Sequence, residues 1–289
     1  MLGLNLRKKP RRVGLALGGG GVRGLAAVPI LKTLDELGLE VSHVAGTSMG
    51  AIVGALYALG LSGSEIEARV RDHIVLRDDN IRSLYQKRKH LLRWLRVFGI
   101  ATGRGGILSA DGAFKHLFSE IAEREFADTQ RQFVAIATNF WNGEEVVLQQ
   151  GALLPAIKAS MALPGIFHPV EIDGQLLVDG GLVNNVPYDK LIGEVDFCIA
   201  VDVMAPPHAE GEEVPSAYET LLGAVDIMQV NALKLKLKLA KPDILIQPDI
   251  ERVRILDFPK IEYGLECGEI AAKKLRAQLE SEYSWLIRT

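Results

Sequence analysis

Ser48 is the residue in this sequence best placed to do covalent chemistry. It lies in the pentapeptide G-T-S-M-G, residues 46–50, whose G-x-S-x-G form makes a tight strand-to-helix turn and exposes the serine hydroxyl for nucleophilic attack. The short apolar run at 43–45 predicts the end of a strand, and residues 51–59 predict a buried helix that stops at Gly60. Taken alone, the pentapeptide could equally be a small-residue turn without chemistry. Its strand-and-helix context favours a nucleophile.

A second motif that could take part in catalysis is the glycine loop at residues 18–24, G-G-G-G-V-R-G. It matches the G-x-G-x-x-G dinucleotide fingerprint, but that site also needs an acidic residue at the end of the second strand, about 20 residues on. This chain has Gly46-Thr47-Ser48 there, and it lacks the Gly-Lys-Ser/Thr of a phosphate-binding loop. We therefore predict a backbone anion hole, in which successive N–H groups stabilise charge developing on a substrate oxygen.

A serine hydroxyl needs a neighbouring base before it is a useful nucleophile. His208 is the only histidine after Asp179, and it lies in an acidic, proline-bounded loop; His168 is better explained as a structural or pocket residue. Asp179 ends a β-run and is followed by Gly180 and Gly181, which leave space for a neighbouring backbone. Partial burial would raise its pKa and make it a stronger base. Taken by itself, Asp179 could also be an ordinary Asp-Gly loop residue.

The elements that must position these residues follow from hydrophobic patterning. Residues 13–17 predict a buried strand, and the first sixty residues predict a βαβα unit with parallel strands. Further strands are predicted at 133–138, 145–149, 195–203 and 244–247, with a hairpin across an Asp-Gly turn at 170–178. Helices are predicted at 64–73 (with Ser64 as N-cap), 152–161, 221–240 and 263–283. The run 233–239 alternates like a strand, but the length of the pattern favours a helix.

Composition restricts the function classes. The chain has 289 residues, 48% of them apolar, and no repeat or linker, which indicates a basic arm at 1–12 and a single domain at 13–289. A net charge of −3 gives no reason to expect nucleic-acid binding. Cys198 and Cys267 are too far apart for a metal motif or a disulfide framework. Without a signal peptide or an apolar run near the ~18 residues of a membrane span, we expect a cytoplasmic protein.

One segment predicts contact with a membrane. Residues 82–96 contain six Lys or Arg and no acidic residue, interleaved with leucine and aromatic side chains. This composition is typical of a helix at an anionic lipid interface, and a basic surface helix packed on the domain is an equal alternative. The glycine-rich residues 99–106 would suit a hinge. We expect residues 81–106 to form a flap or a membrane-facing segment, which would place the protein at the inner face of the membrane.

Together, the glycine loop, the serine pentapeptide and Asp179-Gly180-Gly181 resemble the three sequence blocks of the patatin-like phospholipase family. Residues 159–169, A-S-M-A-L-P-G-I-F-H-P, resemble the block that precedes the family's aspartate. Order and spacing agree, and the resemblance covers nearly everything after about Arg12. The bacterial branch and the catalytic domain of neuropathy-target-esterase-like lysophospholipases are most similar. Plant patatins usually have Asp where this chain has Gly18, a departure that leaves the other loop glycines in place.

The resemblance implies a three-layer αβα sandwich with a mostly parallel central sheet and a dyad of Ser48 and Asp179. It further implies an oxyanion hole at Gly20 and Gly21 with the neighbouring Gly19. The residues that would support these motifs are Arg23, Gly24, Gly46, Gly50, Gly180 and Gly181. No cofactor or metal is implied, and the substrate would be a phospholipid, a lysophospholipid or another acyl ester. Two alternatives stay open: a thioesterase or acyltransferase using the same serine, and a non-catalytic adaptor that keeps the fold. The oligomeric state is not indicated.

Overall fold

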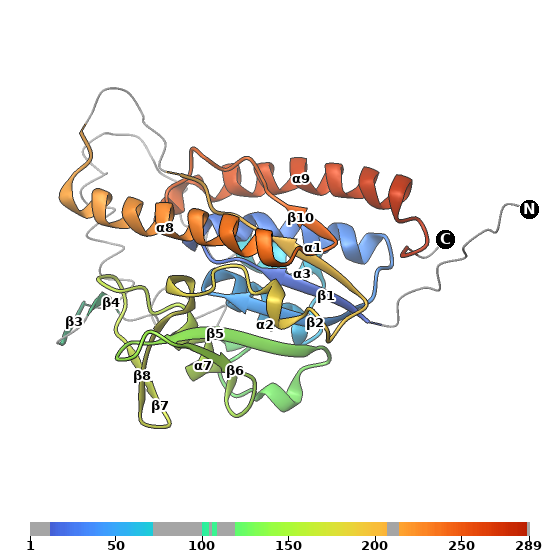
Figure 1. Ribbon diagram of the computed structural model, residues 1–289. Coiled ribbons are helices and arrows are strands. Elements are labelled where there is room, and N and C mark those ends of the chain that lie inside the picture. The colour runs from blue at the N-terminus through green and yellow to red at the C-terminus, as the bar shows by residue number, and fades with distance from the viewer. Residues whose placement is uncertain (1–11, 72–99, 104–105, 109–118, 207–213, 288–289) are drawn as a thin grey trace, which may run out of the picture.

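The computed structural model describes residues 12–71, 100–103, 106–108, 119–206 and 214–287 (Figure 1). The predicted basic segment 82–96, His208 and all of the N-terminal arm except Arg12 lie outside the described residues. The fold is a mixed α/β sheet with helices on both sides. This confirms the predicted αβα class.

The central sheet has the strand order β10-β9-β1-β2-β5-β8-β7, with β6 also paired to β5. Within the described residues, its parallel strands are β1 (Val13–Leu17), β2 (Val41–Thr47), β5 (Gln132–Asn139), β9 (Phe197–Val201) and β10 (Ile244–Ile246). The antiparallel edge consists of β6 (Glu145–Leu148), β7 (Val170–Ile172) and β8 (Gln175–Asp179). A separate two-stranded antiparallel sheet joins β3 (Ile100–Gly103) to β4 (Gly106–Leu108).

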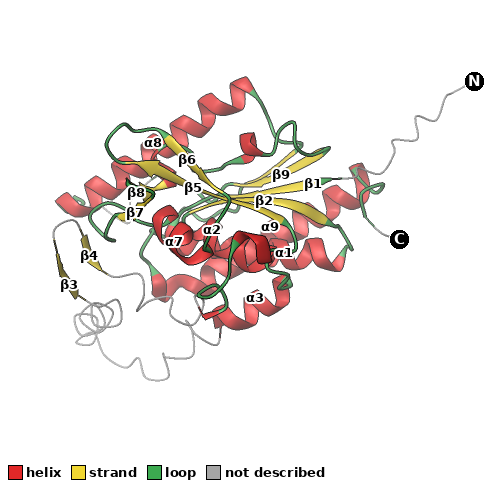
Figure 2. Cartoon of the chain, turned by 90° about the horizontal axis from the view of Figure 1, so that it is seen from below, coloured by secondary structure: helices red, strands yellow, loops and turns green. Residues whose placement is uncertain are grey.

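Helices cover both faces of the sheet, as Figure 2 shows with α8 on one side and α1, α2, α3 and α7 on the other. Their bounds are α1 (Ala27–Glu36), α2 (Met49–Ala58), α3 (Gly63–Val70), α7 (Leu153–Ser160), α8 (Ala217–Leu239) and α9 (Ile261–Glu282). Short 3₁₀ helices are η1 (Gly21–Ala26), η3 (Phe126–Asp128), η4 (Gly180–Leu182), η5 (Tyr188–Lys190) and η6 (Phe258–Lys260).

The continuous apolar strands are explained by burial on both faces. Every residue of β1 and β9 is buried. Leu15 and Leu17 belong to the large core shared with α1, α2 and α9, whereas Ala16 belongs to a smaller core with Leu233 of α8. A strand covered on both sides has no polar face, so it shows no hydrophobic alternation.

Strand register brings the three motifs to one edge of the sheet. Leu17 pairs with Gly46, so the glycine loop after β1 and Ser48 after β2 leave the sheet side by side. Thr47 pairs with Ile136 of β5, and the next residue of β5, Ala137, pairs antiparallel with Asp179. The antiparallel β8 therefore ends at the same edge at which the parallel strands end.

Three local expectations need comment. The hairpin across Asp173-Gly174 is confirmed, with both turn residues at positive φ (50° and 73°). Ser64 as the cap of α3 was wrong: the cap is Ser62, which forms a capping box with Glu65 and leaves Ser64 inside the first turn. The glycine loop is also shorter than its sequence suggests, because the chain enters η1 at residue 21.

Candidate active site

Ser48 occupies a strained turn between β2 and α2. Its backbone has φ 54° and ψ −123°, and it is the N-cap residue of α2. Among the described residues, only Ser48 and Asp173 are non-glycine residues with positive φ. Such a conformation costs about 1–3 kcal/mol and persists only where the surroundings impose it. Here the Ser48 N–H donates to the Ser160 hydroxyl at 2.9 Å, and the Thr47 hydroxyl donates to the Asn184 carbonyl at 2.9 Å.

The motif glycines around this turn are positions of close packing. A Cβ atom at Gly50 would lie 2.2 Å from the Leu17 carbonyl oxygen. Side chains are excluded in the same way at Gly24 (2.7 Å from Met49 Cβ), Gly46 (2.5 Å from the Gly50 oxygen) and Gly180 (2.2 Å from the Ile136 oxygen). At Gly181 the nearest atom is the movable end of a side chain, Gln229 Nε2, at 2.7 Å. These glycines let the strand ends and the three loops approach one another.

Asp179 is buried beside Ser48, with 4% of its surface exposed. Its carboxylate caps η4 by accepting the Gly181 N–H at 2.7 Å. Burial raises the pKa of Asp179 from 3.8 to about 6, although hydrogen bonds from the Gly181 N–H and the Ser48 hydroxyl oppose the shift. The aspartate is therefore a stronger base than a solvated one and is still mostly ionised at neutral pH.

The glycine loop is oriented by hydrogen bonds to its own carbonyl groups. Asn185 Nδ2 donates to the Gly19 oxygen at 3.1 Å, and the Arg23 N–H donates to the Gly20 oxygen at 3.2 Å. In a trans peptide the C=O and the following N–H point in opposite directions, and no described peptide bond is cis. The N–H groups of Gly20 and Gly21 therefore point away from these two partners.

Gly19 differs from its two neighbours. Its N–H donates to the Asn185 backbone oxygen at 3.2 Å, so this donor is already engaged within the fold. A Cβ at Gly19 would lie 2.9 Å from Ser48 Cβ. Its place is thus beside the serine, where any side chain would collide, and we restrict the proposed oxyanion donors to Gly20 and Gly21.

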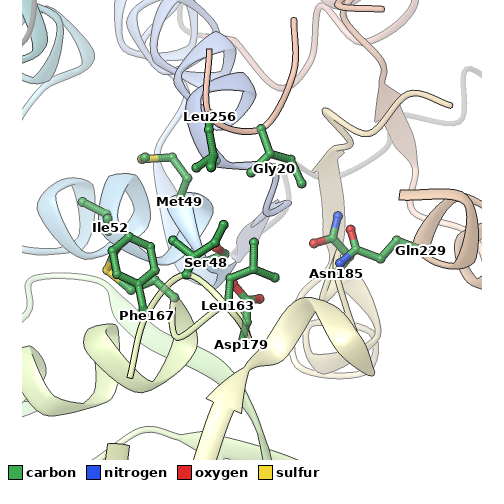
Figure 3. Close-up of a pocket in the computed structure, with 14 residues that line it drawn as sticks. Gly20, Ser48, Met49, Ile52, Leu163, Phe167, Asp179, Asn185, Gln229 and Leu256 are labelled. Atoms are coloured by element: carbon green, nitrogen blue, oxygen red, sulfur yellow. The ribbon is translucent and has the colours of Figure 1, made fainter. Parts of the chain in front are cut away.

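A pocket opens onto Ser48, Asp179, Gly20 and Gly21. Figure 3 shows Ser48 between Asp179 and Gly20, with Asn185 and Gln229 to one side. The rest of the lining is apolar and comprises Met49, Ile52, Met161, Leu163, Ile166, Phe167, Ile255 and Leu256. The arrangement brings the candidate nucleophile, the candidate base and the glycine backbone N–H groups to one end of an otherwise apolar cavity.

Four residues that sequence reasoning did not select take part in this geometry. Ser160 and Asn185 hold the backbone of the serine turn and of the glycine loop, and Gln229 of α8 lines the pocket. The fourth, Asp226 of α8, pairs at 2.8 Å with Arg23, which does not line the pocket. The serine turn and the glycine loop are thus contacted by side chains from α7, α8 and the segment after η4.

The remaining candidates contribute nothing to this site. His168 is not among the pocket residues, and its buried Nε2 has no hydrogen-bond partner among the described residues.

Across the described parts of the chain, no group of three or more His, Cys, Asp or Glu side chains is arranged to hold a metal ion. Nor does any described helix combine the length and apolarity needed to cross a bilayer.

Comparisons with known proteins identify the family. The family model described as patatin-like phospholipase matches residues 15–192, more than half of the chain. The uncharacterized NTE family protein Rv2565 of Mycobacterium tuberculosis (strain ATCC 25618 / H37Rv) is 29% identical, over 94% of this chain and 47% of its own length. Lysophospholipase NTE1 of Scheffersomyces stipitis is 26% identical, over 91% of this chain and 18% of its own. The chain therefore spans about half the length, or less, of these curated relatives.

Among solved structures, VipD from Legionella pneumophila matches with a TM-score of 0.48 and 14% identity, over 93% of this chain and 67% of that one.

Proposed function

This chain belongs to the patatin-like phospholipase family, and on that premise we propose that it hydrolyses the acyl esters of lipids through an acyl-enzyme on Ser48. One observation carries the proposal. Ser48 and the buried Asp179 carboxylate line the same pocket, and most of the remaining lining is apolar. A hydrolase of polar substrates would have little use for such a lining.

In the proposed first step, Ser48 Oγ bonds to the ester carbonyl carbon while its proton passes to Asp179. The carbonyl π electrons move onto oxygen, and the N–H groups of Gly20 and Gly21 donate to that oxyanion. Collapse of the tetrahedral intermediate breaks the bond to the alcohol, which leaves with the proton from Asp179. Water then attacks the acyl-serine, and the same groups act in the reverse order.

The apolar lining of the pocket supports a substrate with an acyl chain. Eight of the fourteen pocket residues present aliphatic, aromatic or thioether side chains, and they begin directly beside Ser48. An acyl chain that enters this cavity leaves water for apolar contacts, which favours binding by about 25 cal/mol per Å² of buried area. We propose phospholipids or lysophospholipids as the substrate class, and the name of the relative lysophospholipase NTE1 supports this choice.

The test compares Ser48→Ala and Asp179→Asn with wild type on a p-nitrophenyl acyl ester. Each substitution should reduce turnover by at least about a thousandfold, since a nucleophile and its base act as a unit. Asp173→Asn is the matched control, because Asp173 lies in the exposed turn of the same hairpin and tolerates asparagine at positive φ. Wild-type turnover in either active-site variant would refute the dyad.

The reaction class is tested separately with wild type. Incubation with mixed phospholipids and lysophospholipids, followed by mass spectrometry, should release free fatty acid and identify the ester cleaved. Preferential cleavage of acyl thioesters, or transfer of the acyl group to an added alcohol, would instead indicate a thioesterase or an acyltransferase. A folded wild-type protein whose Ser48 is not labelled by a fluorophosphonate would indicate an adaptor.

A further inference from the structure

Arg23 of the glycine loop forms an ion pair with Asp226 in the middle of α8. The side chains are only 4% and 6% exposed, and Nη2 lies 2.8 Å from Oδ2. The Arg23 Nε also donates to the Val253 carbonyl at 2.5 Å, in the segment that follows β10. The guanidinium therefore joins three parts of the chain behind the proposed oxyanion donors.

Stability is a weak explanation for this buried pair. Arg23 Nη1 and Asp226 Oδ1 are buried without a hydrogen-bond partner among the described residues. A buried ion pair must offset the loss of hydration of both charges, and well-packed apolar side chains of similar volume often serve a fold as well or better. An incompletely satisfied pair in such a position calls for an explanation other than stability.

The backbone of Arg23 bonds to a specific peptide plane of the glycine loop. The backbone N–H of Arg23 donates to the Gly20 oxygen at 3.2 Å, which fixes the direction of the Gly21 N–H on the same peptide. The next N–H, that of Val22, donates to the Ile255 oxygen at 3.0 Å. A displacement of Arg23 would therefore rotate the Gly20–Gly21 peptide.

Room for relaxation at this loop is limited. A Cβ at Gly21 would lie 2.2 Å from the Ile255 oxygen, so the backbone of the loop already lies against residues 253–255. Gln229, three residues after Asp226 and hence on the same side of α8, lines the pocket. The face of α8 that carries Asp226 is thus the face turned toward the site.

We propose that Asp226 is a positioning residue for acylation of Ser48: through Arg23 it holds the Gly21 N–H in line with the developing oxyanion. The inference rests on the proposed function, because it assigns Asp226 a role in a step that Ser48 performs. A misplacement of about 1 Å in a catalytic group can cost a hundredfold in rate. Neither charge touches the substrate, so substrate binding should change little.

The experiment measures two quantities on Asp226→Asn: kcat and KM for a p-nitrophenyl acyl ester, and the rate at which a fluorophosphonate labels Ser48. Asparagine keeps the shape of the side chain but removes the carboxylate that is bonded directly to the Arg23 guanidinium. We expect kcat and the labelling rate to fall by about tenfold to a hundredfold, with KM changed less than about threefold. A purely structural role would lower the melting temperature and leave both rates per folded molecule unchanged.

The double variant tests whether Asp226 acts through Arg23. Arg23→Met should lower kcat by a similar factor, and adding Asp226→Asn to it should cause no further loss, because the two residues act as one unit. Independent, multiplying effects would overturn the inference. Arg23→Lys should give an intermediate loss of kcat. Lysine keeps the positive charge, but one ammonium group does not have the shape of the guanidinium group that bonds both Asp226 and the Val253 carbonyl.

Asp35→Asn is the matched control for the loss of a hydrogen-bonded carboxylate. Asp35 accepts bonds from the Tyr57 hydroxyl (2.7 Å) and the Gly63 N–H (2.6 Å). It lies in the last turn of α1, just before β2 begins, at the opposite edge of the sheet from Ser48. This variant should lose thermal stability while Ser48 is labelled at the wild-type rate.

The outcomes separate the inference from the proposed function. Absence of labelling in folded wild type refutes the proposed function itself. Labelling of wild type and of Asp226→Asn at equal rates overturns the inference and leaves the proposed function intact. If Asp226→Asn does not fold, Asp226→Glu and Arg23→Lys provide the same comparison, and a wild-type rate in a folded Arg23→Lys protein is equally decisive against it.

Discussion

Replacing Asp179 with asparagine should stabilise the protein, and the gain should grow with pH. The folded-state pKa of Asp179 is raised by burial from 3.8 to about 6. A raised carboxylate pKa means that the folded state favours the protonated form. The resulting stabilisation is complete below the unfolded-state pKa and is lost as pH rises through the folded-state pKa. Asparagine does not titrate, so the free energy of unfolding of Asp179→Asn does not decrease in this way as the pH rises.

The magnitude follows from the shift. A change of about two pKa units corresponds to about 3 kcal/mol between the fully protonated and the fully ionised protein. By proton linkage, about half of this loss of wild-type stability occurs below pH 5. The free energy of unfolding of Asp179→Asn minus that of wild type should therefore grow by about 1.4 kcal/mol between pH 5 and pH 8. Asparagine keeps the acceptor for the Gly181 N–H. Its pH-independent effects cancel when the two pH values are compared.

The assay is urea unfolding of wild type, Asp179→Asn and the surface control Asp173→Asn at pH 5, 6, 7 and 8. The free energy of unfolding of Asp179→Asn minus that of wild type should increase steadily across the series, while the same difference for Asp173→Asn should stay flat from pH 6 to 8. A constant difference for Asp179→Asn would show that the carboxylate titrates as in water. The account of Asp179 as a base strengthened by burial would then be wrong.

Three further predictions follow from the same geometry. The kcat/KM of wild type on an acyl ester should fall below pH about 6 as Asp179 becomes protonated, and a pH–rate profile that stays flat down to pH 5 would contradict this. Gly50→Ala should cost more than about 3 kcal/mol of stability or prevent folding, since its Cβ would lie 2.2 Å from the Leu17 oxygen; thermal unfolding at wild-type temperature would refute the packing argument. Ser160→Ala should lower stability by about 1–3 kcal/mol by leaving the Ser48 N–H without its partner, measurable by urea unfolding and absent if another acceptor replaces the hydroxyl.

The fold could be predicted largely from sequence because its elements have strong local signals. The buried strands lack polar residues, and the Asp-Gly turn fixes its hairpin. The cap of α3 could not be chosen in the same way: Ser62 precedes Glu65 by three residues and Ser64 precedes Glu67 by three, so both have the spacing of a capping box, and the structure uses Ser62. For the run 233–239, helix length outweighed strand-like alternation, and the run forms the end of α8.

Only those residues of the candidate site that belong to short sequence motifs could be predicted. Ser48 and Asp179 could be selected because nucleophile and base must be particular residue types. Asn185 could not, because it acts by bonding a backbone 166 residues away, and no local pattern encodes that contact. Gly19 illustrates the same limit. Three consecutive glycines are indistinguishable in sequence, and only the direction of each peptide plane shows that the Gly19 N–H is already engaged.

The side-chain partners of Arg23 are distant in the sequence, and this separation has a consequence for the chain during its synthesis. Its side-chain partners lie 203 and 230 residues further on, so all three motifs leave the ribosome before the contacts that align the glycine loop exist. At synthesis rates of about 5–20 residues per second, residue 255 follows residue 181 by roughly 4–15 s. During that interval the nascent polypeptide carries serine, aspartate and glycines in an unfinished arrangement. We expect the proposed ester hydrolysis to begin only after residue 255 has been synthesised.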